Sequence, residues 1–290
     1  MQLILSILLY TSFLTILSIS FSELYAILRF FHLAHAMTLT LGAYFVFVMS
    51  ILLGWPLWVS VILSVTTVIF LMTAMNKWVY GPLQNRGAES WQLMIASLGL
   101  YVVLQNLVSL CCGDRTMSFR TWDIKAGIPF LGAQITIIQI VTILACMVLI
   151  VFFWLFLNRT NTGGKIKAAS SNSELSRVVG VSRERVVIWV MVICTGIASC
   201  AGILIAADSD LTPTMGFNWL LYAVVAMTIG GMGKMRHLIL GSLLLASAQV
   251  SVAYFFDSKW MNATAYIILI VFLYFRPYGF SGRKLKKTEI

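Results

Sequence analysis

The segment NRTNTGGKIKAASSNSELSRVVGVSRER (158–185) is polar and basic, and it interrupts a sequence that is mostly apolar on both sides. Its cations are Arg159, Lys165, Lys167, Arg177, Arg183 and Arg185. Near its centre the residue order predicts a short helix. Because the flanking runs are apolar, the helix would project from a membrane-embedded body.

The short helix has a start, a face and an end. Its start can be capped by Ser171, Asn172 or Ser173, with Glu174 favourable in the positive first turn. Spacing places Leu175, Val178 and Val179 on one face, beside Arg177, and Gly180 can close the end. Two interpretations stay open from these residues: a helix held by a cytoplasmic partner, or a solvated loop that only fixes the topology.

The composition is that of a membrane protein. Hydrophobic residues make up 60% of the chain and charged residues 10%, whereas soluble domains have about 25% charged residues. Several runs reach the roughly 18 apolar residues that predict a membrane span. We therefore expect an all-α integral membrane protein, with residues 1–290 forming one transmembrane domain and no large soluble domain.

The apolar runs predict about nine spans, with a range of about 8–10 because two runs are short. The first run lacks a basic segment before it, so we interpret it as a retained span and not a removed signal. We expect polar loops at 76–90, with Pro82 and Gly87 as breakers, and at 111–127. The runs are 2–20, 37–53, 57–75, 91–110, 129–157, 186–206, 218–229, 238–254 and 263–275.

The charges predict an orientation. If 158–185 is cytoplasmic, alternation places 15 of the 20 Lys and Arg residues on the inner side and four outside, with Arg29 unassigned. The inner tail, 276–290, is basic as well. The net charge of +10 is thus explained by topology and does not indicate nucleic-acid binding. We expect the C-terminus inside, and Met1 outside if the number of spans is odd.

Polar residues inside apolar surroundings mark candidate positions in a pathway. His32 and His35 lie on one face of a helix, but two ligands are too few for a metal site. Glu23 and Arg29 should face protein, water or each other, because charges in hydrocarbon are costly. These four residues predict the polar lining of a pathway or the cap of a broken helix.

Glycines cluster at the end of one short span and after the histidine pair. Such residues permit close helix packing, and they also permit a helix to break where a transporter binds its solute. The segment GGMGK (230–234) lacks the glycine and the Ser/Thr of a phosphate-binding loop. We therefore expect no ATP site, no cofactor and no catalytic centre on this chain. The glycines are Gly42, Gly230, Gly231, Gly233 and Gly241, and all but Gly241 are candidate pathway residues.

Four stretches and the tail resemble one family in order along the whole chain. They are RFFHLAHAMTLTLGAYF (29–45), YGPLQNR with ASLGLYVVLQNLVSL (80–110), GGKIKAASSNSELSRVVGVSRERV (163–186), LTPTMGF with AVVAMTIGGMGKMRHLILGSLLLA (211–246), and FRPYGFSGR (275–283). The chain resembles the LivH-like permeases of bacterial branched-chain amino-acid ABC importers, a group that includes urea-importer permeases.

The resemblance implies a permease of the type II-like ABC importer class in the bacterial inner membrane. Implied partners are a second homologous permease, two cytoplasmic ATPases, an extracytoplasmic solute-binding protein and the bilayer, with ATP hydrolysed on the ATPases. The implied mechanism is alternating access, with a coupling helix at Ser173–Val181 that docks into an ATPase. The solute is an amino acid, branched-chain in the first place, or else urea or a short amide.

Several residues depart from the family pattern. His32 stands where Asn is usual, Ala36 and His237 stand where Gly is usual, and Lys234 replaces a small residue. In the coupling segment, Lys165 and Lys167 replace arginines, and Ser176 stands near a usual Ala. We hypothesise that His32 changes the reading of the solute or makes it pH-dependent.

Two rival functions remain to be separated by experiment. One is an ATP-independent channel or secondary carrier, against which the coupling-like segment and the lack of a membrane-embedded carboxylate relay argue. The other is a structural or regulatory subunit without a pathway, against which the glycine-broken helices argue.

Overall fold

Helices that can cross a membrane dominate the computed structural model, which describes residues 1–120, 127–130, 133–231, 235–276 and 279–280. Among these residues, eight helical segments are long and apolar enough to span, and α10 (Met215–Gly230) is a shorter apolar helix. The prediction of an all-helical membrane fold is confirmed. The eight segments are built on α1 (Gln2–Leu28), α2 (Ala36–Phe47), α3 (Leu57–Met75), α5 (Ser90–Cys112), α6 (Ile137–Arg159), α9 (Arg183–Ser209), α11 (Met235–Phe255) and α12 (Met261–Phe275).

Among the eight spans, those of α1, α2 and α9 are the most buried. Helix α1 packs against α9, α10 and α11, while α2 packs against α9 and α3. Glycines set these close crossings: a Cβ on Gly202 of α9 would lie 2.4 Å from the carbonyl oxygen of Leu39 on α2. By contrast, most side chains of α3, α5, α6 and α12 are partly or fully exposed. In a bilayer, such faces meet lipid or another subunit.

The predicted polar loop at 76–90 is wrong for most of its length. Helix α3 continues through a π-helical turn at Asn76–Tyr80 into α4 (Gly81–Asn85). Pro82 does not break this helix because it sits in the first turn of α4, where a missing N–H costs no hydrogen bond. The chain turns instead at Gly87, whose φ of +78° lies in the left-handed region.

The predicted span at 129–157 starts too early. Residues Ile128–Phe130 (β1) and Ala133–Ile135 (β2) form an antiparallel hairpin, with Ile128 opposite Ile135. Helix α6 begins only at Ile137, where Thr136 and Gln139 form a reciprocal capping box. Pro129 explains the error, since it interrupts an apolar run that hydropathy alone reads as helix.

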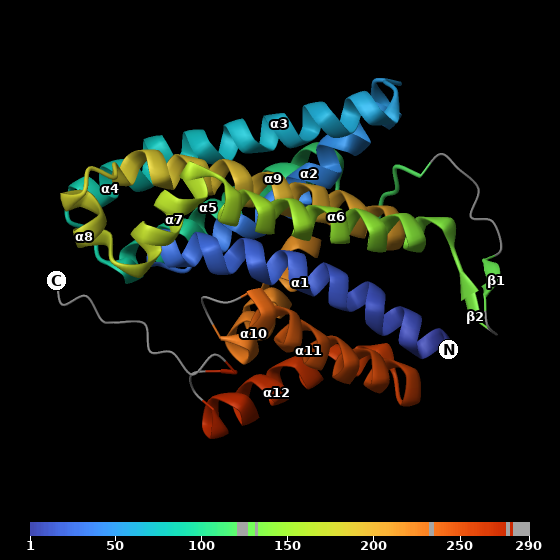
Figure 1. Cartoon of the computed structure of the whole chain (residues 1–290). Helices are drawn as coiled ribbons and strands as arrows, with labels where there is room; N and C mark the ends of the chain where they lie inside the picture. The colour runs from blue at the N-terminus through green and yellow to red at the C-terminus, as the bar shows by residue number, and fades with distance from the viewer. Residues whose placement is uncertain (121–126, 131–132, 232–234, 277–278, 281–290) are drawn as a thin grey trace.

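The polar segment 158–185 lies at one end of the molecule (Figure 1). Helices α7 (Asn161–Ser171) and α8 (Ser173–Val178) lie at the same end as α4, whereas the N-terminus and the β1–β2 hairpin lie at the opposite end (Figure 1). At that opposite end, the segment before the hairpin, which includes Met117 and Arg120, binds to the turn between α9 and α10. Met117 and Leu211 exchange backbone hydrogen bonds, and Arg120 forms an ion pair with Asp210.

Candidate functional site

Helix α8 begins and ends as its sequence dictates. Asn172 is the cap residue among the three candidates, and its side-chain oxygen accepts from the N–H groups of Glu174 (3.1 Å) and Leu175 (3.0 Å). The helix starts at Ser173 and ends at Val178, shorter than the expected Ser173–Val181. Gly180, with φ +83°, then reverses the chain, as a helix-terminating glycine does.

The apolar face of α8 points outward. Leu175 is 61% exposed, Val178 83% and Val179 70%. The polar Ser176 takes the inward position at 5% exposure. Arg177 and Glu174 are exposed beside them. Because a solvated helix normally buries its apolar side chains, this inversion leaves an apolar patch on the surface of the isolated chain, as interaction surfaces do.

Helix α7 anchors α8 to the membrane body, and the sequence did not predict it. Thr160 caps this helix by accepting from Gly163 N–H at 3.0 Å. A Cβ on Gly163 would lie 2.5 Å from the carbonyl oxygen of Phe156, so only glycine lets α7 lie directly on α6. Ile166 is buried at this contact. The Thr160 cap followed by Ile166 was the available sequence signal.

Arg29 connects the end of α1 to this anchor. It ends α1 in a left-handed conformation, and its guanidinium donates to the Ser170 carbonyl oxygen of α7 at 2.7 Å. Of the alternatives expected for Arg29, namely protein, water or Glu23, the structure shows protein, and the ion pairs of the described residues lie elsewhere. A charge-assisted hydrogen bond therefore connects α7 to the end of α1.

His35 holds the break between α1 and α2. Its Nε2 lies 3.0 Å from the hydroxyl oxygen of Ser20, which itself donates to the carbonyl oxygen of Cys194 on α9 at 3.0 Å. Since the hydroxyl has one hydrogen, His35 is the donor in its bond. Ser20 lies eight residues before the end of α1 at Leu28, which is about 12 Å at 1.5 Å per residue. Because His35 contacts Ser20, the chain must fold back over this length before α2 starts.

His32 is equally buried but has an aromatic setting. Its ring packs edge-to-face on Tyr80 at 5.0 Å between centroids, and neither ring nitrogen has a hydrogen-bond partner among the described residues. Both histidines are 2% exposed. A solute could touch them only after the surrounding helices separate, so their predicted place in the pathway stays a prediction. The backbone next to them is fixed by Ala34 N–H donating to Ser97 at 2.8 Å.

The predicted pathway glycines lie at tight helix contacts. A Cβ on Gly42 would meet the Ser199 hydroxyl oxygen at 2.4 Å, and one on Gly230 would meet the carbonyl oxygen of His237 at 2.5 Å. Gly231 ends α10 with φ +78°. Gly233 lies outside the described residues. Where described, these glycines join α2 to α9 and α10 to α11, and their role in solute passage stays a prediction.

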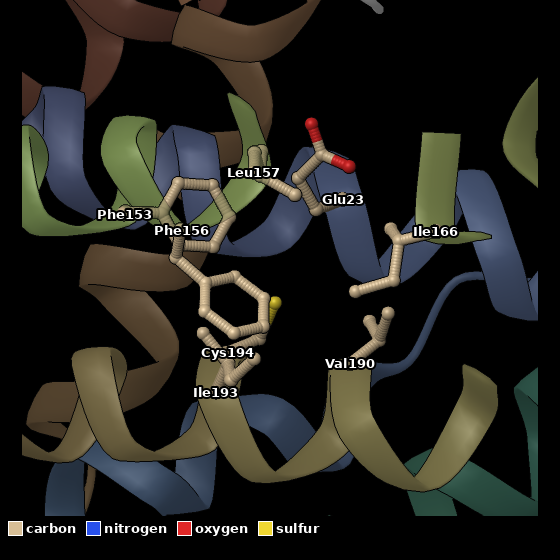
Figure 2. Close-up of a pocket in the computed structure, with 8 residues that line it drawn as sticks. All are labelled: Glu23, Phe153, Phe156, Leu157, Ile166, Val190, Ile193 and Cys194. Atoms are coloured by element: carbon tan, nitrogen blue, oxygen red, sulfur yellow. The ribbon is translucent and has the colours of Figure 1, made fainter. Parts of the chain in front are cut away.

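Glu23 lies on the side of α1 that faces α6, α7 and α9. It shares a small cavity with Phe156, Ile193 and Cys194, and its carboxylate extends away from these apolar side chains (Figure 2). No described residue gives this carboxylate a hydrogen bond or an ion pair. The arrangement thus brings Glu23 and Arg29 to the anchor of α7, apart from the histidines that the sequence grouped with them.

Comparison with known proteins places this architecture in a sequence family. The family model described as branched-chain amino acid transport system / permease component matches residues 3–275. In the solved structure of PsaBC from Streptococcus pneumoniae in complex with Fab, one chain is similar with a TM-score of 0.52 and 13% sequence identity, over 99% of this chain and 95% of that one. This second likeness shows the fold alone.

Curated relatives match over most of the chain. The high-affinity branched-chain amino acid transport system permease protein BraD of Pseudomonas aeruginosa is 24% identical, covering 92% of this chain and 91% of its own length. LivH of Escherichia coli, described in the same words, is 24% identical with the same coverage. The ribose import permease protein RbsC of Escherichia coli is 32% identical over 99 residues, which is 32% of this chain.

Proposed function

Because the chain belongs to the family of permease components of branched-chain amino acid transport systems, we propose that it forms half of the membrane pathway of an ATP-driven amino-acid importer. It is an ABC importer permease that crosses the membrane several times and has no catalytic role itself. The relatives BraD and LivH support branched-chain amino acids as the solute class. At 24% identity, urea or short amides are the alternative solutes within this class of permease.

The proposed assembly follows from what an importer permease requires. A second homologous permease completes the pathway, two ATPases bind at the α7–α8 end, and a solute-binding protein docks at the end with the β1–β2 hairpin. The α7–α8 end is cytoplasmic in this proposal, because the basic residues concentrate there. The membrane is the bacterial inner membrane.

One observation carries the coupling mechanism: α8 exposes its apolar side chains and buries its polar Ser176. Burying Leu175, Val178 and Val179 in an ATPase groove would contribute about 1.5–3 kcal/mol each. Ordering the contact reduces the sum, yet enough remains for docking. Arg177 would make a polar contact at the rim.

Movement of the ATPases then reaches the pathway through the chain's own contacts. Helix α8 is tied to α7, α7 lies on α6 through Gly163, and the Ser170 carbonyl holds Arg29 at the end of α1. Beyond Arg29 lies the fold-back to His35 and the start of α2. Closure of two ATPases would therefore move the α1–α2 break, which is where the proposal places alternating access.

Paired substitutions on α8 test the docking face. Replacing Val178 and Val179 with Asp removes about 3–6 kcal/mol of apolar burial and adds carboxylates that are costly to desolvate. We expect at least about a 100-fold loss of ATPase affinity, at 1.4 kcal/mol per tenfold. The readouts are co-purification of the ATPases and uptake of labelled leucine in proteoliposomes. Asn161→Asp with Ala168→Asp, at exposed positions of α7, is the matched control.

Retained assembly and transport in the Val178/Val179 variant would refute the docking assignment. Uptake that continues when the ATPases are deleted or blocked with vanadate would instead support a channel or secondary carrier. A binding screen of the cognate binding protein with leucine, isoleucine, valine and urea identifies the solute. Reconstitution with and without this chain separates a pathway-forming role from a regulatory one.

A further inference from the structure

A second, larger cavity opens beside Glu23, and the proposed transport mechanism does not use it. Its volume is about 830 Å³, and it lies between the C-terminal parts of α1 and α6, the end of α7 and the first turns of α11. Polar groups line one part of it: Glu23, Asn158, Lys167, Ser170, Arg236 and His237. Pockets that bind drug-sized ligands measure about 300–1,000 Å³.

The other part of the cavity is apolar and continues onto the outer face of α6. Val151 and Trp154 line the cavity while being 49% and 47% exposed. Along the same helix, Val148 and Leu144 are exposed at 66% and 56%. Where this face of α6 meets lipid and not another subunit, the cavity is open sideways to hydrocarbon as well as to water. A ligand that fits both parts has a charged end and a long apolar end.

The charges at the cavity are complementary to a zwitterionic headgroup. The Lys167 ammonium is held in place by donating to Asn158 Oδ1 at 2.6 Å, and Arg236 stands on the first turn of α11. Neither cation forms an ion pair with a described residue. Glu23, on α1, supplies the one carboxylate of the cavity lining. Two cations beside one carboxylate match a phosphate that carries an attached ammonium group.

We propose that this cavity binds an aminophospholipid of the leaflet on the α7–α8 side. The phosphate lies between Lys167 and Arg236, the ethanolamine ammonium lies against Glu23, and the acyl chains run along Val151 and Val148 of α6. Basic pockets between transmembrane helices are known to take phospholipid headgroups. A free amino acid would match the charges but would leave the apolar wall of the cavity unfilled, at the cost of lost contacts.

A bound lipid would connect α7 with α11, two helices that otherwise touch little. It would contact α7, which anchors α8, together with α11, which packs on α10 and α12. The lipid would therefore stabilise the position of the coupling segment. This inference concerns binding and does not depend on which solute is transported.

Native mass spectrometry of the full chain tests the proposal. The chain is purified in mild detergent and incubated with equal amounts of dioleoyl phosphatidylethanolamine, phosphatidylglycerol or phosphatidylcholine. We expect the ethanolamine lipid to be retained best, because only its ammonium has N–H groups to donate to Glu23. Lys167→Gln and Arg236→Gln should each lower its retention about tenfold. Lys165→Gln, exposed on the same helix and outside the cavity lining, should retain it fully.

Glu23→Gln should abolish the preference for ethanolamine over glycerol headgroups while leaving some lipid bound. If that variant fails to fold, judged by gel filtration and thermal melting, Lys167→Gln on the exposed side of α7 still tests the phosphate contact. Equal retention of all three lipids by the parent and by Lys167→Gln would overturn the proposal. So would displacement of the lipid by excess leucine or by inorganic phosphate, since either result would make this a site for a soluble ligand.

Discussion

The adjacent glycines of α7 offer a direct test of how the coupling segment is held. A Cβ on Gly163 would lie 2.5 Å from the Phe156 carbonyl oxygen and 2.6 Å from Leu157 Cα, whereas a Cβ on Gly164 would meet no atom within 4 Å. Both obstacles are backbone atoms of α6, which cannot rotate away. Gly163→Ala must therefore lift α7 by about 1 Å to restore van der Waals contact.

The size of the expected effect follows from the difference in free energy between the Gly163→Ala and Gly164→Ala variants. Each Gly→Ala change gains about 1 kcal/mol of helix propensity, and this gain cancels when the variants are compared. What remains is the overpacking of Gly163→Ala against α6, about 1–3 kcal/mol. We therefore expect Gly164→Ala to be neutral or stabilising. Gly163→Ala should weaken ATPase binding about 5- to 150-fold relative to it, because α8 is displaced with α7.

The assay is ATPase binding to the permease in nanodiscs, together with the thermal melting of each variant. A displaced α7 also lengthens the Arg29–Ser170 hydrogen bond. Gly163→Ala should therefore lower uptake relative to Gly164→Ala even where the two variants have similar melting temperatures. Equal ATPase affinity for the Gly163→Ala and Gly164→Ala variants would refute the argument, since it would show that α7 does not position α8.

Three further predictions concern single residues. Asn172→Ala removes the cap of α8 and should cost about 1 kcal/mol, seen as weaker ATPase binding with Asn172→Asp as the capping control; unchanged binding would contradict it. Gly42→Leu should prevent α2 from packing on Ser199 of α9 and lower the yield of folded protein, whereas Gly99→Leu, in open space on α5, should not; similar yields would contradict this. His32→Asn should change the solute specificity of uptake or its pH dependence. If the variant and the parent agree in both properties, the hypothesis is wrong.

Features that depend on local sequence were predicted well. Apolar runs located the helices, because a span needs only length and hydropathy. The cap at Asn172 and the reversal at Gly180 follow from residue chemistry over a few positions. The family was predictable too, since its motifs occur in order along the chain.

Errors arose where the local pattern had two outcomes. Pro82 was read as a breaker, but a first-turn proline fits a helix, and the π-helical turn before it absorbs the change. The apolar run from residue 129 was read as helix, although Pro129 and the Thr136 cap mark a hairpin before it. The residues around the Gly163–Gly164 pair carried no helix prediction, although α7 forms there. The first glycine of the pair is the contact that lets α7 lie on α6.

The sequence by itself determined that this chain crosses a membrane several times, that its polar segment lies outside the apolar body, and which family it resembles, because hydropathy, charge and motif order are properties of the chain alone. Only the tertiary structure decided which way side chains face. It turned Leu175, Val178 and Val179 outward and Ser176 inward, and it buried His32 and His35 in the interior. It also paired Arg29 by a hydrogen bond with the Ser170 carbonyl oxygen and not with Glu23. Such choices depend on contacts between segments far apart in sequence, which no local pattern encodes.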